Sequence, residues 1–339
     1  MYQGGARLAQ LIAPARRLAL VGLAKNTGKT ETLAAILAEH ARTGLCVGVT
    51  SIGRDGEERD VIDPRIAKPR VRLQRGSLVA STGALLRASG LEHERLLQTQ
   101  IRTPLGEVVV ARLEQDGAVE VAGPSAAADV RAVSEAMSGL GARRILIDGA
   151  IDRRAASAPA VAEGLVMATG AVLGERVEDV VAATAEAVEL ARLPLFADGS
   201  EPPVAVGRRI ALGGAPEEIA GLLRAYPEAQ AFELEGALSE GFLQALLAAR
   251  RERAGRQLQL VVRYSTRVFL SQRGPGWYER QGISLRVREP IELHAITVNP
   301  VAPQSHRFDS QRLRELIEAA VPDVPVLDVL DPSYLALAK

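Results

Sequence analysis

Short aliphatic runs alternate with segments of helical periodicity along the first half of the chain. The runs at 18–21 and 45–49 are short, apolar and rich in branched residues, as buried strands are. Between them Leu33, Ile36 and Leu37 recur at helical spacing. A strand, helix and strand of this length form a parallel unit with a right-handed crossover. The pattern therefore predicts an α/β fold on a mostly parallel sheet.

The same alternation continues to about residue 191. Helices are predicted at 82–88, at 127–140 and at 175–191, and strands at 118–122, 145–147 and 164–168. The segments 94–101 and 106–113 flank a Pro-containing turn and predict an antiparallel pair. This half of the chain thus adds an antiparallel section to the parallel sheet.

A Pro-containing stretch at 198–203 predicts a linker between two domains. We expect a P-loop nucleotide-binding domain at 1–200 and a smaller C-terminal α/β domain at 204–339. The second domain again mixes short strands and helices. It contains no further phosphate loop, and its role is left open. The only tryptophan, Trp277, is expected to cover the core of that domain or to form a contact site.

Composition excludes several classes of function. The 41 basic and 41 acidic residues balance, and aromatic residues make up only 3% of the chain, so we expect no nucleic-acid partner. The apolar run after Arg17 is too short for an export signal, and no run reaches membrane-spanning length. The single Cys46 excludes a disulfide framework. These features predict a soluble cytoplasmic protein with no membrane partner.

The segment from Gly22 to Thr30, GLAKNTGKT, joins the first strand to the first helix. Its glycines allow backbone N–H groups to surround an anion, and the helix directs its partial positive end to the same place. Lys29 is expected to reach the β- and γ-phosphates of a nucleotide, and Thr30 to hold Mg²⁺. The expected cofactor-binding residues are Gly22, Lys25, Asn26, Thr27, Gly28, Lys29, Thr30 and, beyond the loop, Thr169.

Lysine usage supports this interpretation. The chain has only four lysines, Lys25, Lys29, Lys68 and Lys339, and otherwise uses arginine. Two of the four stand in one short loop, which indicates that a compact ammonium is needed there and not a guanidinium fork.

Acidic residues at two further strand ends extend the predicted site. Asp148 ends the aliphatic run at 145–147, an arrangement typical of a carboxylate that binds Mg²⁺ or its water. Asp55 and Glu57 lie in a charged segment after the second strand, where a first switch is expected. Asp55 is a second candidate for Mg²⁺, and Glu57 for orienting the attacking water. A solvated charged loop is the alternative for this segment.

The nucleotide is expected to be ATP. The Asn-Lys-x-Asp pattern that reads guanine is absent from the stretch 164–171, and no lysine remains to form it. The turn at Thr169 either lines the nucleotide or packs tightly. Lys29, Asp55 and Glu57 are the candidate catalytic residues, with Thr30, Asp148 and Asp55 as candidate metal ligands.

The phosphate loop resembles a known variant. In the strict pattern the first glycine stands five positions before the second, where this chain has Leu23; Gly22 lies one residue earlier. This longer form resembles dethiobiotin synthetase and cobyrinic acid synthase, which belong to the class that includes MinD. The signature lysine of the MinD-type loop falls at Ala24, so Lys25 is not its positional equivalent.

Four segments together are similar to a bacterial family found with cobalamin-dependent aminomutases. They are 22–30, 50–57, 147–153 and 296–300. The similarity is to the KamB-type subunit of the lysine 5,6-aminomutase reactivase. It implies an ATP-driven protein that renews inactivated cobalamin in the aminomutase, together with a MutS-like ATPase subunit. It transfers only the nucleotide residues Lys29, Thr30 and Asp148.

Two other functions stay open on the sequence alone. One is an ATP-dependent ligase of the dethiobiotin synthetase type, which activates a small carboxylate near Asp55 and Thr169. The other is a nucleotide-binding regulatory protein that hydrolyses little, because no glutamine that positions water is identifiable. A homodimer is an additional alternative for the assembly.

Overall fold

The computed structural model describes residues 4–52, 70–149, 158–197, 202–213, 215–250, 257–303 and 306–331. The chain forms two compact units, a large unit of residues 1–184 with 292–339 and a small unit of residues 185–291. This division differs from the expected domains at 1–200 and 204–339. The expected boundary is displaced because the last strands of the chain pair with the first sheet, so the small unit is inserted into the large one.

A nine-stranded sheet forms the centre of the large unit, in the order β17-β16-β9-β1-β8-β2-β4-β6-β5. From β17 to β4 every neighbouring pair is parallel, and β6 and β5 add an antiparallel edge. The mixed α/β class with a mostly parallel sheet is therefore confirmed. The strands are β1 (Arg17–Gly22), β2 (Val47–Ser51), β4 (Leu78–Thr82), β5 (His93–Thr103), β6 (Gly106–Leu113), β8 (Arg144–Gly149), β9 (Gly164–Gly170), β16 (Glu292–Asn299) and β17 (Val326–Leu327).

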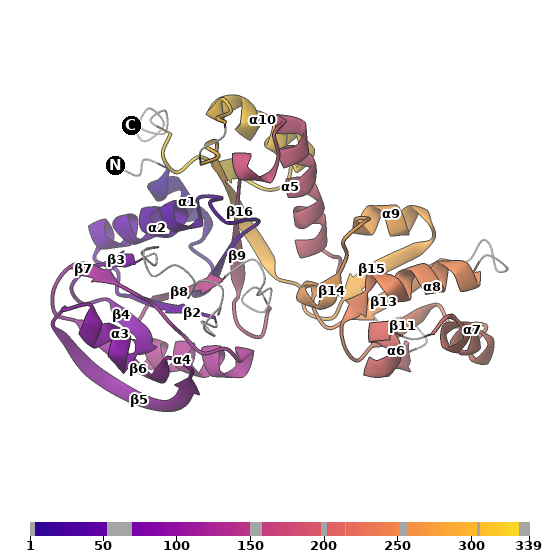
Figure 1. The fold of residues 1–339 in the computed structure, drawn as a ribbon, viewed down its shortest axis with the longest axis horizontal. Helices are drawn as coiled ribbons and strands as arrows, with labels where there is room; N and C mark the ends of the chain where they lie inside the picture. The colour runs from indigo at the N-terminus through magenta and orange to yellow at the C-terminus, as the bar shows by residue number, and fades with distance from the viewer. Residues whose placement is uncertain are drawn as a thin grey trace. The chain divides into compact units, whose positions relative to one another are not determined.

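Helices cover both faces of the parallel part of this sheet. Figure 1 shows α2 and α4 on opposite sides of β2 and β8. Leu33 and Ile36 of α2 pack into the main core with Leu18 and Leu20 of β1. The helices of the large unit are α1 (Gly5–Leu11), α2 (Lys29–Thr43), α3 (Gly83–Ala88), α4 (Ala127–Gly139), α5 (Val177–Ala191), which continues into the small unit, and α10 (Ser310–Ala320). The short strands β3 (Val71–Leu73) and β7 (Gly117–Val119) pair separately.

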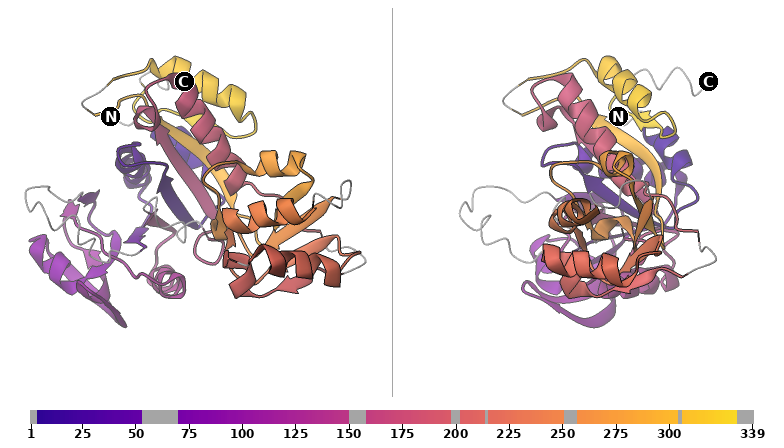
Figure 2. Two further views of the ribbon diagram at one scale, coloured as in Figure 1. Left: turned by 45° about the vertical axis from the view of Figure 1, so that its right-hand side comes forward. Right: turned by 90° about the vertical axis from the view of Figure 1, so that its right-hand side faces the viewer.

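Strand β16 returns to the large unit after the small unit has been completed. It runs parallel to β9 along its whole length, with Glu292 opposite Gly164 and Asn299 opposite Gly170. In Figure 2 the yellow-orange strand β16 lies beside the magenta strand β9. The end of β16 is thereby placed at the same edge of the sheet as the end of β1.

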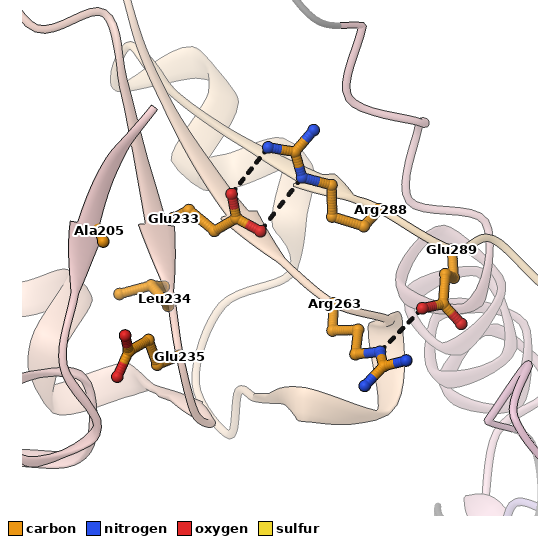
Figure 3. A pocket seen from close by; sticks show the side chains of 7 residues that line it. All are labelled: Ala205, Glu233, Leu234, Glu235, Arg263, Arg288 and Glu289. Atoms are coloured by element: carbon orange, nitrogen blue, oxygen red, sulfur yellow. Dashed lines mark hydrogen bonds and ion pairs between the residues drawn. The ribbon is translucent and has the colours of Figure 1, made fainter. Parts of the chain in front are cut away.

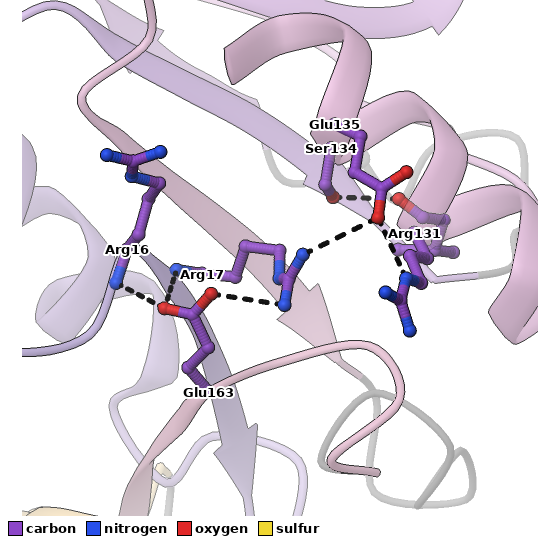
Figure 4. Close-up of polar contacts among 7 residues, drawn as sticks. Arg16, Arg17, Arg131, Ser134, Glu135 and Glu163 are labelled. Carbon is purple, nitrogen blue, oxygen red and sulfur yellow. Dashed lines mark hydrogen bonds and ion pairs between the residues drawn. The ribbon is translucent and has the colours of Figure 1, made fainter.

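Ion pairs fix the amino end of β1. Glu163, just before β9, accepts hydrogen bonds from the backbone N–H groups of Arg16 at 2.8 Å and Arg17 at 3.4 Å, and its carboxylate pairs with the Arg17 guanidinium at 3.1 Å. The Arg17 guanidinium also lies 3.9 Å from Glu135 of α4, as Figure 4 shows. The two adjacent strands and α4 are thus tied together at the edge opposite the loop that follows β1.

The small unit has its own parallel sheet and core. Its sheet has the order β10-β11-β13-β15, from β10 (Val204–Val206), β11 (Ala231–Leu234), β13 (Leu258–Val262) and β15 (Ile283–Val287). Alternate residues such as Phe232, Leu260 and Leu285 join a core with Leu243 of α8. The other elements are α6 (Arg208–Gly213), α7 (Pro216–Ala225), α8 (Glu240–Arg250), α9 (Pro275–Arg280), β12 (Leu238–Ser239) and β14 (Val268–Phe269). Trp277 is partly buried and packs against this core.

Several local predictions are confirmed. The antiparallel pair is present as β5 and β6, and α3, α4 and α5 occupy the segments predicted as helices to within two residues at each end. Within the described ranges, no helix combines the length and apolar character needed to cross a bilayer.

Candidate functional site

The carboxyl ends of β1, β8 and β9 meet at one edge of the large sheet. Val21 lies opposite Gly149 of β8, and Gly22 lies opposite Ala168 of β9. The loop after β1 is joined to β9 by a hydrogen bond of 2.9 Å from the Leu23 N–H to the Ala168 carbonyl. Ligands of parallel sheets bind at this edge, because the loops that follow the strands diverge there.

The loop from Gly22 to Gly28 is tightly curled. Gly28 has a left-handed φ of +85° and caps α2, and Asn26 also has a positive φ of +67°. A Cβ atom on Gly22 would lie 2.6 Å from the hydroxyl oxygen of Thr27, so this position accepts only glycine without rearrangement. The buried Thr27 hydroxyl donates to the Ala24 carbonyl at 2.9 Å and holds the curl closed.

Lys29 is the first residue of α2, and its side chain bridges to the neighbouring strand. Its ammonium pairs with the Asp148 carboxylate and donates a hydrogen bond of 2.8 Å to the Gly149 carbonyl. Both side chains retain about a quarter of their exposure, 24% for Lys29 and 29% for Asp148. The pair is therefore fixed in position and still accessible to a ligand.

Three further candidate residues of the loop face solvent. Lys25, Asn26 and Thr30 are exposed, and no side chain caps the amino end of α2. The first N–H groups of a helix lack intrahelical acceptors, and the helix dipole makes this end attractive to anions. The loop, Lys29 and the amino end of α2 together can hold a polyanion.

Thr169 has a different environment from these residues. Its side chain is fully buried at the end of β9 and forms a 2.7 Å hydroxyl–hydroxyl hydrogen bond with Thr184 of α5. Thr184 in turn donates to the Val180 carbonyl at 2.7 Å. The structure thus places Thr169 in a packing contact between strand and helix, the second of the two roles expected for this turn.

Sequence reasoning did not select Asn299, which lies at the end of β16. Its side-chain amide donates a hydrogen bond of 2.9 Å to the Asn26 carbonyl. Cβ atoms on Gly28 and Gly170 would each lie 3.0 Å from the Asn299 Cβ. Asn299 therefore contacts the loop from the far end of the chain. The signal for it was the strand-like run at 296–298 that ends in Asn-Pro.

Two candidate residues, Asp55 and Glu57, lie outside the described residues. Among the residues that the structure does describe, there is no group of three or more His, Cys, Asp or Glu side chains that suits a metal ion. Thr30 and Asp148 are the described candidates for Mg²⁺. Both flank Lys29, and Mg²⁺ commonly uses one or two protein oxygens and takes its other ligands from phosphates and water. The residues present therefore fit this ion.

No family model, curated protein or solved structure matches the chain.

Proposed function

We propose that this protein is a P-loop ATPase that binds ATP with Mg²⁺ at the loop 22–30. The observation that carries the proposal is the position of Lys29. It stands at the amino end of α2, after a left-handed Gly28, and reaches the Asp148 carboxylate at the end of the adjacent strand. A phosphate chain on the loop amides would exchange this contact for one with its own oxygens.

The chemistry proposed is transfer of the γ-phosphoryl group to water. Phosphoryl transfer depends mainly on positioning and on neutralising charge. Lys29 and the N–H groups of the loop and the first turn of α2 bind and orient the phosphates. Thr30 and Asp148 would hold Mg²⁺, which would supply positive charge that neutralises the phosphates. Glu57 orients the water, and Asp55 assists at the metal.

We further propose that hydrolysis drives the reactivation or assembly of a partner enzyme. The similarity to KamB-type proteins favours a cobalamin-dependent aminomutase as that partner, with a MutS-like ATPase subunit. In this scheme the segment that carries Asp55 and Glu57 responds to the γ-phosphate and changes the surface presented to the partner.

The test compares Lys29→Ala with Lys25→Ala, two truncations of lysine within the same loop. ATP and Mg²⁺ are supplied, phosphate release and ATP affinity are measured, and GTP is run in parallel. Lys29→Ala is expected to weaken ATP binding by about 100-fold or more, because each of two lost charge-assisted hydrogen bonds contributes about 1.5–3 kcal/mol. Lys25→Ala should also weaken ATP binding, because Lys25 is one of the expected cofactor-binding residues, but by less than Lys29→Ala, because its side chain is exposed.

A further arm adds a cobalamin aminomutase to the wild-type protein. Slow phosphate release that rises with the mutase and vanishes in Lys29→Ala supports the reactivase function. Tight ATP binding without release in any arm favours a ligase that lacks its substrate, or a regulator. If Lys29→Ala binds ATP as the wild type does, the proposed site is wrong.

A further inference from the structure

A second charged site lies in the small unit, at the carboxyl ends of its parallel strands. A pocket of about 480 Å³ is lined by residues at the ends of β10 and β11 and in the segments that follow β13 and β15. Its charged residues are Glu233, Glu235, Arg263, Arg288 and Glu289, all labelled in Figure 3. Its volume and its place at the end of a parallel sheet are typical of a small-molecule site.

Two ion pairs organise the pocket. The Arg288 guanidinium forms a fork with the Glu233 carboxylate, through hydrogen bonds of 3.1 and 2.7 Å. The same guanidinium lies 4.8 Å from the centre of the Phe196 ring, which supports it from a second side. On the neighbouring segment Arg263 donates to Glu289 at 2.8 Å. Both guanidinium groups are thus held in defined positions.

Glu235 completes the set without joining either pair. It is exposed, and Figure 3 shows its carboxylate apart from both ion pairs. Two arginines and three glutamates give the lining a formal net charge of −1. The pocket therefore offers planar donor groups for a carboxylate and several acceptors for an ammonium group within one small volume.

We propose that this pocket binds a small zwitterion, a molecule that carries a carboxylate and an ammonium group, such as an α-amino acid. The carboxylate is held by the guanidinium of Arg288 or Arg263, and the ammonium group by the glutamate that this arginine releases. Each of the four paired charges, Glu233, Arg263, Arg288 and Glu289, keeps a partner in this exchange. A dicarboxylate would instead add like charge to three glutamates, and a diamine would offer the two arginines no acceptor to replace a glutamate that it draws away.

The net charge of the pocket also predicts which zwitterions bind more tightly. Glu235 leaves one negative charge uncompensated when both arginines are paired. A ligand with a second ammonium group compensates this charge, so its affinity should exceed that of a ligand of equal length with a neutral side chain. This inference does not rest on the proposed ATPase, because its residues lie in the small unit alone.

The experiment is calorimetric titration of the full-length protein with four five-carbon probes: norvaline, ornithine, glutarate and cadaverine. Saturable binding is expected for the two amino acids, tighter for ornithine, and none for glutarate or cadaverine. At least one of Arg288→Ala and Arg263→Ala, the variant that removes the arginine holding the carboxylate, should weaken binding about tenfold or more. Glu235→Gln should remove the preference for ornithine. Lys29→Ala should bind both amino acids as the wild type does.

Matched controls separate the pocket from general effects. Arg224→Ala removes an exposed arginine of α7 that does not line the pocket, and it should leave binding unchanged. Arg263 is itself largely exposed, so Arg263→Ala should not disturb folding. The proposal is overturned if neither amino acid binds at millimolar concentration. It is also overturned if glutarate or cadaverine binds as tightly as ornithine, or if both arginine variants bind as the wild type does.

Discussion

The two sheets of this protein place polar groups at the same edge by different means. In the large unit the edge beyond β1 and β8 carries backbone N–H groups, a helix terminus and the ion pair of Lys29 and Asp148. In the small unit the corresponding edge carries five charged side chains and two ion pairs. The first set is fixed by the backbone, and the second depends on side chains that can exchange partners.

Strand order explains part of this difference. In the large sheet the chain passes from β1 to β2 and leaves between them a position that β8 fills later. It then continues to β9, which lies on the other side of β1. Such a reversal separates the loops and opens a crevice beside β1. In the small sheet the order β10-β11-β13-β15 proceeds in one direction. Its site is therefore built by side chains at successive strand ends. The first arrangement supports the proposed phosphate site, and the second supports the proposed zwitterion site.

The largest expected effect tests whether the two units are independent. Phe232 is almost fully buried in the core of the small unit, so Phe232→Ala should cost about 3–5 kcal/mol of unfolding free energy there. Trp277, the only tryptophan, lies in the same unit, and its fluorescence in a urea titration reports this loss. Phe269→Ala, at a side chain 51% exposed, should change the free energy by about 0.5 kcal/mol or less. A parallel fall in ATP affinity in Phe232→Ala would contradict independence.

Acid should lower the stability of the large unit. His40 of α2 is buried, and burial, with the nearby charge of Arg144, lowers its pKa from 6.5 to about 4. The unfolded chain binds this proton near pH 6.5 and the folded chain only near pH 4, so stability is lost as the pH falls between these values. The expected loss is about 3 kcal/mol.

The readout for His40 is hydrogen exchange of peptides from β1 and β8 as a function of pH. His40→Leu should flatten the acid-dependent increase in exchange. His93→Leu, at a partly exposed histidine of β5, should leave that increase unchanged. An identical pH profile in wild type and His40→Leu would show that other groups cause the acid sensitivity.

Alkali should lower the stability of the small unit. The Tyr278 hydroxyl is buried and donates to the Glu240 carboxylate at 2.9 Å, and burial, together with this bond, raises its pKa to about 12. The unfolded phenol ionises near pH 10, so stability is lost as the pH rises from about 10 to about 12. The loss should be about 2–3 kcal/mol.

Trp277 fluorescence follows this alkaline transition, because Trp277 stacks edge-on against Tyr278. Tyr278→Phe should lack the alkaline loss, although it leaves Glu240 with one hydrogen-bond donor fewer. Tyr226→Phe, at a tyrosine 47% exposed, serves as the control and should retain the loss. An alkaline transition of unchanged size in Tyr278→Phe would refute this assignment.

The smallest effect on stability concerns the loop glycine. Gly28 and Gly76 have nearly equal left-handed φ angles, +85° and +84°. Alanine at either position should cost about 1 kcal/mol of backbone strain. A Cβ atom on Gly28 would meet Asn299, whereas a Cβ atom on Gly76 would have no atom of the described residues outside its chain neighbours within 4 Å. Gly28→Ala should therefore weaken ATP binding, measured by calorimetry, and Gly76→Ala should not. Equal ATP affinities of the two variants would show that the loop at Gly28 does not bind the nucleotide.

Local features of the large unit could be predicted from the sequence because they depend on short-range pattern. The aliphatic runs fix β1 and β8, and the glycines fix the turn into α2. Asp148 was selected because a carboxylate at a strand end is informative beside a phosphate loop, and the parallel register of β1 and β8 does bring it to Lys29.

Long-range pairing could not be predicted in this way. The run at 296–298 indicates a strand, but nothing local identifies β9 as its neighbour, so Asn299 and the domain boundary were both missed. Thr169 shows a second limit, since the partner of a buried hydroxyl depends on how α5 packs. The charged pocket of the small unit was missed for the same reason: its residues come from four separate strand ends.

The insertion of the small unit between β9 and β16 has a consequence for the growing polypeptide. Every residue of β9 is buried in the finished protein, yet 121 residues separate Gly170 from Glu292. At about 5–20 residues per second a ribosome needs roughly 6–24 s to span this interval. Throughout that time the apolar β9 presents unpaired backbone groups on one edge. We therefore predict that nascent chains arrested before residue 292 are protected by chaperones, and that proteases cut β9 in those chains but not in chains released at full length.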